Sequence, residues 1–222
     1  MSEKNIFNLL NENNLPLPKG IIQIGASYGQ EIEMFKNNGI NYCIMVEPLD
    51  APFEYISKIC KITPNYLALK ALCNDADGEE VKFYIASNGG QSSSMLKPDK
   101  HLEIFDYVKF DNVININTTT TDNLFKFVCE NGYSEVVNQI DTLYMDVQGA
   151  EYKVLLGSIK TLKKINYIYF EHIRGSLYEN SVDLVDYVVL LNSLGFTLNY
   201  LNYDNTHHTN VLFVRKNILG IK

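Results

Sequence analysis

The 222-residue sequence has no tryptophan, only four cysteines and no apolar run of membrane-spanning length. A membrane helix needs about 20 consecutive apolar residues, so no membrane insertion is expected, and the N-terminal stretch lacks the apolar core of a signal peptide. The cysteines, Cys43, Cys60, Cys73 and Cys129, show no CxxC spacing, which argues against a zinc site. We expect buried free thiols and a cytoplasmic protein.

Basic residues are in deficit, because 19 Lys and Arg stand against 26 Asp and Glu and give a net charge of −7. The average surface field therefore repels polyanions. Nucleic acid is not expected as a partner. The sequence contains no internal repeat, and its length suits one α/β domain without a linker.

Short apolar runs alternate with segments of helical spacing along most of the chain. This alternation predicts an α/β fold with a mostly parallel sheet and helices on both faces. We expect a leader helix within residues 1–19 and the main domain in residues 20–222. Strands are expected at 20–24, 42–46, 66–72, 81–85, 113–119, 142–147, 165–171, 196–201 and 211–215, and helices at 28–38, about 53–60, 121–129, 150–162 and 182–194.

The pattern makes three local predictions. The loop between the last two strands is too short for a crossover helix, so these strands should be antiparallel. Thr121 and Asp122 are expected to cap the helix that follows them. Residues 86–112 are irregular and rich in Gly, Ser, Asp and Lys, and long loops of this kind often bind ligands. Acceptor specificity is therefore expected there and in the final loops, and the serines at 92–94, which include Ser93, are candidate contacts of the cofactor or the substrate.

A glycine turn, Gly25-Ala26-Ser27-Tyr28-Gly29, lies where the first strand passes into a helix. Exposed backbone amides at such a turn favour a nucleotide cofactor. About twenty residues later, Glu47 ends the second strand, where a carboxylate can accept hydrogen bonds from ribose hydroxyls. Turn and acid together predict an adenosine-containing cofactor. The spacing is not the GxGxxG of NAD-binding proteins, which disfavours a dehydrogenase.

The same turn also spells GxSxG, the nucleophile elbow of α/β-hydrolases, with Ser27 as the nucleophile. An elbow needs several strands and an oxyanion loop before it. Only about twenty residues precede this strand, so the hydrolase interpretation is disfavoured.

Several motifs together resemble the FkbM family of S-adenosylmethionine-dependent methyltransferases over roughly residues 20–215. They are Ile21-Ile22-Gln23-Ile24-Gly25-Ala26-Ser27-Tyr28-Gly29, Val46-Glu47-Pro48, Gln91-Ser92-Ser93-Ser94, Thr120-Thr121-Asp122 and Asp146-Val147-Gln148-Gly149-Ala150-Glu151. The last is the most specific and carries Gln148 where the family has Glu. Gln23 likewise replaces a usual acid.

The resemblance implies a Rossmann-like class I methyltransferase fold whose seven-stranded, mostly parallel sheet has an antiparallel last strand. It implies O-methylation of a sugar, glycan or other small hydroxylated metabolite, with S-adenosylmethionine as cofactor. Carried over by position, the implied cofactor contacts are Gly25, Ala26, Tyr28, Gly29, Glu47, Pro48, Asn74, Asp75, Ser93 and Asp146.

Two polar residues at strand ends are the candidate catalytic groups. Asp146 should open into the cleft at the carboxyl edge of the sheet, to engage the cofactor's amino group or orient the acceptor hydroxyl. His172, at the end of the next strand, is the candidate general base, since an imidazole titrates near neutrality. Glu151 is interpreted as structural. Asp146 and Glu171 could approach each other, but no metal is predicted.

Two other function classes remain open. One is a nucleotide-dependent oxidoreductase. The other is a cofactor-binding module without catalysis, which the changes at Gln23 and Gln148 keep open.

Overall fold

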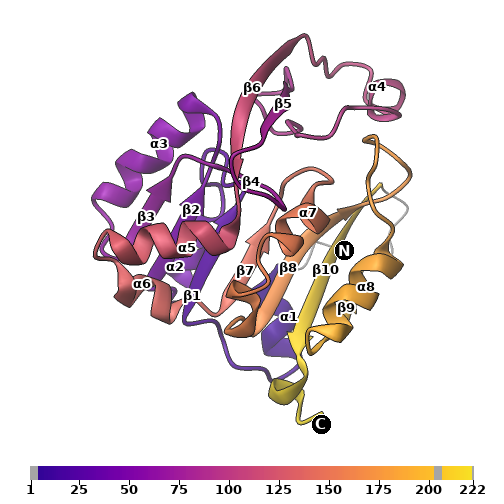
Figure 1. Ribbon diagram of the computed structural model, residues 1–222. Helices are drawn as coiled ribbons and strands as arrows, with labels where there is room; N and C mark the ends of the chain where they lie inside the picture. Colours follow the sequence, from indigo (N-terminus) through magenta and orange to yellow (C-terminus); the bar gives the residue numbers. More distant parts are fainter. Residues whose placement is uncertain (1–4, 203–206, 222) are drawn as a thin grey trace.

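The computed structural model describes residues 5–202 and 207–221, which form a central sheet with helices on both faces (Figure 1). The seven strands of the main sheet have the order β3-β2-β1-β7-β8-β10-β9. Strand β10 is antiparallel to both of its neighbours, and the other pairs are parallel. The predicted Rossmann-like sheet with its antiparallel last strand is therefore confirmed.

The central strands of the main sheet are short, buried and apolar, as a sheet covered on both faces requires. The strands of this sheet are β1 (Gly20–Ile24), β2 (Tyr42–Val46), β3 (Tyr66–Leu69), β7 (Thr142–Met145), β8 (Tyr167–Ile173), β9 (Phe196–Leu201) and β10 (His208–Arg215). Because side chains alternate along each strand, every strand contributes to both layers of the core.

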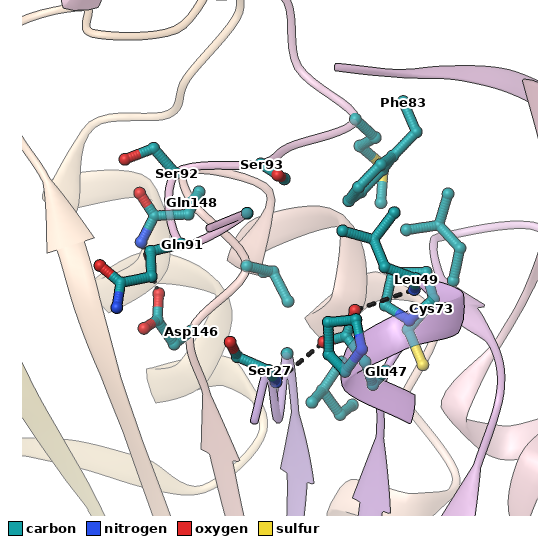
Figure 2. Close-up of a pocket in the computed structure, with 18 of the residues that line it drawn as sticks. Ser27, Glu47, Leu49, Cys73, Phe83, Gln91, Ser92, Ser93, Asp146 and Gln148 are labelled. Carbon is teal, nitrogen blue, oxygen red and sulfur yellow. Dashed lines mark hydrogen bonds between the residues drawn. The ribbon is translucent and has the colours of Figure 1, made fainter. Parts of the chain in front are cut away.

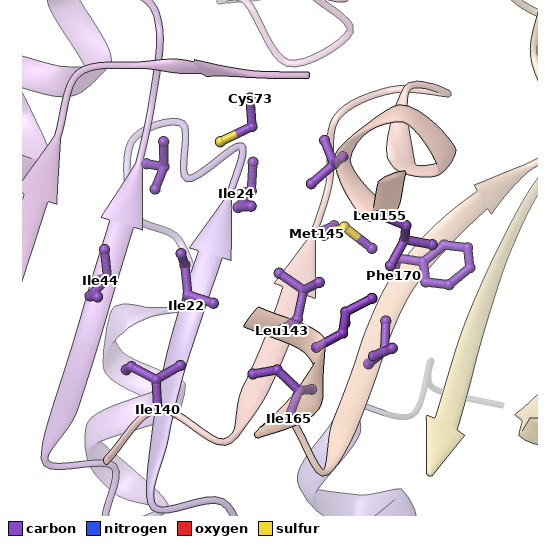
Figure 3. Packing of buried hydrophobic residues seen from close by; sticks show 14 of the residues in the cluster. Ile22, Ile24, Ile44, Cys73, Ile140, Leu143, Met145, Leu155, Ile165 and Phe170 are labelled. Atoms are coloured by element: carbon purple, nitrogen blue, oxygen red, sulfur yellow. The ribbon is translucent and has the colours of Figure 1, made fainter. Parts of the chain in front are cut away.

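Two apolar clusters fill these layers. One lies under α5 (Thr121–Glu130), α6 (Ser134–Gln139), α7 (Glu151–Leu156) and α8 (Leu184–Ser193), where Ile22, Leu143 and Phe170 pack together (Figure 3). The other lies under α1 (Ile6–Glu12), α2 (Ile32–Asn37) and α3 (Asp50–Lys61).

The N-terminal helix α1 is part of the second cluster. Its Phe7 ring meets the Phe35 ring of α2 edge to face, with 6.3 Å between centroids. The predicted leader helix thus packs on the sheet. The division of the chain at residue 19 stays a prediction.

A small second sheet rises beyond the carboxyl edge of the main sheet (Figure 1). It contains β4 (Leu72–Cys73), β6 (Asn112–Thr119) and β5 (Glu80–Ile85), in the order β4-β6-β5. Between β5 and β6, residues 86–111 form a cap with one short helix, α4 (His101–Ile104). Backbone bridges of Ser94 to Tyr84 and of Pro98 to Tyr178 hold the cap in place.

Local differences from the predicted elements have identifiable causes. The helix expected at 150–162 ends at Leu156, with Gly157 as its C-cap. Residue 157 has to be glycine, because an added Cβ would stand 2.0 Å from the Asn74 carbonyl oxygen. A separate 3-10 turn, η1, follows at Thr161–Lys163. Helix α6 was not predicted.

The predicted helix cap is displaced by one residue. Thr120 caps α5 by accepting a hydrogen bond from the Asn123 N–H, whereas Asp122 accepts from the N–H groups of Lys160 and Thr161 at 2.9 and 2.7 Å. Asp122 therefore joins two segments instead of capping its own helix. Within the described part of the chain, no helix has the length and apolarity needed to cross a bilayer.

Candidate functional site

A cavity of about 430 Å³ lies at the carboxyl edge of the main sheet (Figure 2). Its walls come from the loops after β1, β2 and β7, from the ends of β8 and β10, and from the cap. This is where open α/β sheets bind ligands. Of the sequence-predicted site residues, the structure places Gly25, Glu47, Pro48, Ser93 and Asp146 on its wall.

The glycine turn joins two strand ends. Gly25 has φ +82°, and a Cβ there would stand 1.9 Å from the Asp146 carbonyl oxygen. The N–H groups of Gly25 and Ala26 both donate to the Val46 carbonyl at 3.0 Å. The turn is therefore fixed against β2 on one side and the end of β7 on the other.

The other predicted residues of this turn do not line the cavity. Ala26 is fully buried in the cluster under α2. Tyr28 is exposed, and its ring meets Tyr55 edge to face at 5.7 Å. A side chain at Gly29 would collide with Ile32, 2.5 Å away, so this glycine permits close packing of α2. Their contacts with a cofactor stay predictions.

The Glu47 side chain is hydrogen-bonded to the glycine turn. Its carboxylate accepts hydrogen bonds from the Ser27 N–H at 2.8 Å and from the Leu49 N–H at 2.9 Å (Figure 2). Burial raises the pKa of Glu47, and the two backbone donors oppose this rise. Each carboxylate oxygen keeps acceptor capacity beyond one bond, which suits a ligand with paired hydroxyls.

One wall of the cavity beyond Glu47 is apolar. Leu49, Cys73 and Phe83 line it, and Figure 2 shows them apart from Asp146, Gln91 and Gln148. Phe83 was missed from the sequence, because its strand belongs to the excursion and nothing in the chain pattern indicates which way it faces.

Asn74 and Asp75, expected near adenine, lie outside this cavity. The Asn74 N–H donates to the Thr119 carbonyl at 2.9 Å, and the Asp75 carboxylate pairs with Lys153 at 3.3 Å. Both residues connect β4 to neighbouring elements. Their predicted role at adenine stays a prediction.

Asp146 lies at the other side of the cavity beside two further carboxylates, Glu31 and Glu171. Its Oδ1 accepts a hydrogen bond from the Gln148 amide at 2.6 Å. Burial raises the pKa of Asp146, and the negative charge of Glu171 raises it further. The hydrogen bond from the Gln148 amide lowers it. Asp146 and Glu171 thus approach each other, as expected from their strands.

Both glutamines that depart from the family pattern support acids at this wall. Gln148 has φ +53° and lies between Asp146 and the Tyr178 hydroxyl, which is 3.3 Å from its Oε1. Gln23 is buried and donates to Glu31 at 2.7 Å. Glu31 was not among the predicted residues.

The serine run ties the cap to the cavity. Ser93 Oγ accepts from the Ala86 N–H at 3.0 Å, and Ser94 Oγ donates to the Gln148 carbonyl at 2.8 Å. The cap is therefore attached directly to the turn that carries Asp146.

Strand β8 places its two candidate residues on opposite faces. Glu171 lines the cavity, whereas His172 does not; the His172 ring meets Tyr187 of α8 edge to face at 5.5 Å. Burial lowers the pKa of His172, while Asp183 raises it. His208 of β10 does line the cavity, with Nδ1 2.9 Å from Glu171 Oε2. The structure therefore does not bring His172 together with Asp146.

Glu151 holds the Asp146 turn from inside the core. Its Oε1 accepts from the N–H groups of Val147 and Gly149 at 3.0 and 3.3 Å, and it is 1% exposed. Burial raises its pKa to about 8. This contact fits the structural role expected for Glu151.

Glu151→Gln should flatten the dependence of stability on pH. An acid whose pKa is raised on folding contributes stability below its unfolded value, here 4.5, and loses it as the pH rises through about 8. The variant lacks this loss, so urea unfolding at pH 9 should show it more stable than wild type. Exposed Glu33→Gln is the control, and equal pH profiles for wild type and Glu151→Gln would contradict the interpretation.

Among residues 5–202 and 207–221, no group of three or more His, Cys, Asp or Glu is placed to hold a metal ion. The expectation that no metal is bound stays a prediction.

Comparison with known proteins agrees with the site. A family model described as the methyltransferase FkbM domain matches residues 23–198. The 2-O-methyltransferase NoeI of Sinorhizobium fredii (strain NBRC 101917 / NGR234) is 37% identical over 93 residues, which are 42% of this chain and 35% of that protein. The matched part thus spans about a third of the relative.

Solved structures of similar topology share little sequence. Fibrillarin of Aeropyrum pernix with bound S-adenosylmethionine is 11% identical, with a TM-score of 0.49 over 94% of this chain and 74% of that chain. A protein of the NADB-Rossmann superfamily from Streptococcus agalactiae is 10% identical, with a TM-score of 0.48 over 96% and 70%.

The family match covers most of the chain, including the glycine turn, Glu47 and the Asp146 segment. It confirms the resemblance to this family that was drawn from the motifs. The protein belongs to the FkbM family of methyltransferases.

Proposed function

We propose that the protein transfers a methyl group from S-adenosylmethionine to a hydroxyl oxygen of a sugar, glycan or other small hydroxylated metabolite. The observation that carries the proposal is the cavity with Glu47 at one side and Asp146 at the other. The name of the rhizobial relative, a 2-O-methyltransferase, supports oxygen as the acceptor atom.

The residues of the cavity fit this cofactor. The apolar wall of Leu49, Cys73 and Phe83 suits a flat base, and the Glu47 carboxylate suits the ribose hydroxyls. The carboxylates of Asp146 and Glu31 suit the ammonium group at the amino acid end of the cofactor. The volume of about 430 Å³ lies within the usual range for such ligands, about 300–1,000 Å³.

When bound, the cofactor supplies an electrophilic methyl group on a positively charged sulfur. The chain's own part is to orient the acceptor hydroxyl, to exclude water and to accept a proton. Positioning of this kind supplies a large share of the acceleration in displacement reactions. The cap, attached to Gln148 through Ser94, is placed to exclude water.

The acceptor has room beside the cofactor. A second cavity of about 340 Å³ opens on the α2 face and shares Glu31, Asp146 and Glu171 with the first. Carboxylates and amides accept hydrogen bonds from hydroxyl groups, so this wall suits a polyol. It repels the phosphates of nucleic acid, in agreement with the net charge of −7.

A cytoplasmic location belongs to the same proposal. Cys43, Cys60 and Cys73 are buried as free thiols, and burial raises the pKa of Cys73 to about 12. Thiols of this kind are unreactive and suit a reducing compartment.

Cofactor choice can be tested by thermal unfolding. S-Adenosylmethionine and S-adenosylhomocysteine should each raise the melting temperature, because a ligand at 100 times its Kd adds about 2.7 kcal/mol to the stability of the native state. NAD should leave the temperature unchanged. Release of S-adenosylhomocysteine from a panel of methyl glycosides then tests acceptor class. Stabilisation by NAD alone would favour the oxidoreductase alternative, and cofactor binding without any turnover would favour a non-catalytic module.

A further inference from the structure

Glu171 and His208 form a carboxylate–imidazole pair on the cavity wall. Glu171 lies on β8 and His208 at the start of β10, and their Oε2 and Nδ1 atoms are 2.9 Å apart. The Glu171 side chain is 24% exposed and the His208 side chain 30%. Both are therefore partly buried, and a ligand in the cavity can contact them.

The sheet register builds the pair. Strands β8 and β10 are antiparallel, with His208 opposite Ile173 and Asn210 opposite Glu171. His208 is therefore the diagonal neighbour of Glu171, a separation that long side chains span. From the cap, the Phe105 ring lies 6.0 Å from the His208 ring. The imidazole thus lies between two paired strands and the cap.

We propose that His208 is the general base that removes the proton from the acceptor hydroxyl, with Glu171 as its positioning residue. A carboxylate at Nδ1 favours the tautomer in which Nε2 is the basic ring nitrogen. The inference deepens the proposed function and rests on it, because it requires an acceptor hydroxyl within reach of His208, at the wall where the two cavities share Glu171.

The proposed step is balanced by groups already named. The acceptor oxygen forms a bond to the methyl carbon, the carbon–sulfur bond breaks, and its electron pair stays on sulfur. The hydroxyl proton passes to His208 Nε2, and the imidazolium that forms is stabilised by the Glu171 carboxylate. No oxidant, reductant or further reactant is needed.

The arrangement replaces His172 in the role expected from the sequence. His172 lies against Tyr187 on the opposite face of β8. Among the described residues, the charged and titratable groups around His208 include Glu171 on β8, Asp146 after β7, His101 on α4, and Arg174 with His207 in the adjoining loops. The acids favour the charged imidazole formed in the step.

Replacing the base gives the first test. His208→Gln should lower kcat about 100-fold or more on a methyl glycoside that the wild type methylates, since a general base contributes on the order of 10²–10⁴. The Kd for S-adenosylmethionine, measured by calorimetry, should change less than about threefold. The acidic limb of the pH–rate profile should disappear. His207→Gln, the same change at the neighbouring residue, should keep kcat within about twofold.

Nuclear magnetic resonance tests the pair without any acceptor. The chain has four histidines, so their Cε1–H signals can be assigned with single His→Gln variants in the complex with S-adenosylhomocysteine. Glu171→Gln should lower the measured pKa of His208 by about one or more and leave that of His172 in place. Glu171→Gln should also reduce kcat by about tenfold, with a smaller change in KM.

The outcomes separate this inference from the proposed function. If the wild type turns over and the kcat of His208→Gln is within threefold of the wild-type value, the base role is overturned. It is also overturned if His172→Gln loses activity while His208→Gln keeps it. An unchanged His208 pKa in Glu171→Gln would overturn the pair. Absence of wild-type turnover on every hydroxylated probe would instead count against the proposed function, and with it the base role.

Discussion

Gly25→Ala should cost about 3 kcal/mol or more of stability and abolish measurable binding of S-adenosylmethionine. An alanine at φ +82° carries a left-handed backbone cost of about 1–2 kcal/mol. Its Cβ would also lie 1.9 Å from the Asp146 carbonyl oxygen, so β1 and β7 must separate, and overpacking of this kind costs about 1–3 kcal/mol. Urea unfolding measures the first effect and calorimetry the second.

Gly39→Ala is the matched control for this variant. Gly39 has φ +78°, and an added Cβ there would meet nothing within 4 Å. It should therefore show the backbone cost alone, about 1–2 kcal/mol, with unchanged cofactor affinity. The difference between the two variants isolates the contact with Asp146. Equal losses of stability, or cofactor binding retained in Gly25→Ala, would contradict this account of the turn.

The site residues that could be predicted from the sequence are those that follow directly after a buried parallel strand. Gly25 and Glu47 each follow a buried parallel strand directly, and the carboxyl ends of such strands meet at one edge of the sheet. Apolar runs located β1 and β2 to the residue, so the residues that follow them were placed correctly. The antiparallel β9 and β10 were predictable for a similar reason, because a short loop permits only that connection.

The catalytic assignment could not be read so simply. The strand was expected to end at Glu171, but β8 continues to Ile173. Successive side chains on a strand point to opposite faces, so an error of one residue exchanges the cavity for the core. Glu171 thus reaches the cavity, and His172 packs on Tyr187.

Other contributors depend on contacts between distant parts of the chain. Phe83 faces the cavity only because β5 pairs with β6 beyond the main sheet. Glu31 reaches the acid wall because Gln23, buried on β1, donates to it. Neither contact has a sequence signal that distinguishes it from an ordinary strand residue or an exposed helix acid.

Glu47→Gln should weaken S-adenosylmethionine binding about 100-fold or more while leaving the fold intact. The carboxylate accepts the N–H groups of Ser27 and Leu49, and an amide can accept only one of them, so its NH₂ must face the other donor. Hydrogen bonds to charged groups contribute about 1.5–3 kcal/mol each, and about 1.4 kcal/mol corresponds to a tenfold change in Kd. The change also removes the carboxylate that suits the ribose hydroxyls.

Stability should respond differently from affinity in this variant. Burial raises the pKa of Glu47, so ionised Glu47 costs stability at neutral pH, and the neutral amide removes that cost. The backbone N–H that loses its acceptor lowers stability in the opposite direction. The melting temperature without ligand should therefore stay close to that of wild type, while the increase given by the cofactor is lost. Exposed Glu54→Gln on α3 is the matched control and should bind normally. If the Kd of Glu47→Gln for S-adenosylmethionine stayed within threefold of the wild-type value, the ribose could not be held by Glu47. The proposed orientation of the cofactor, with its base at Phe83 and its amino acid end at Asp146, would then be wrong.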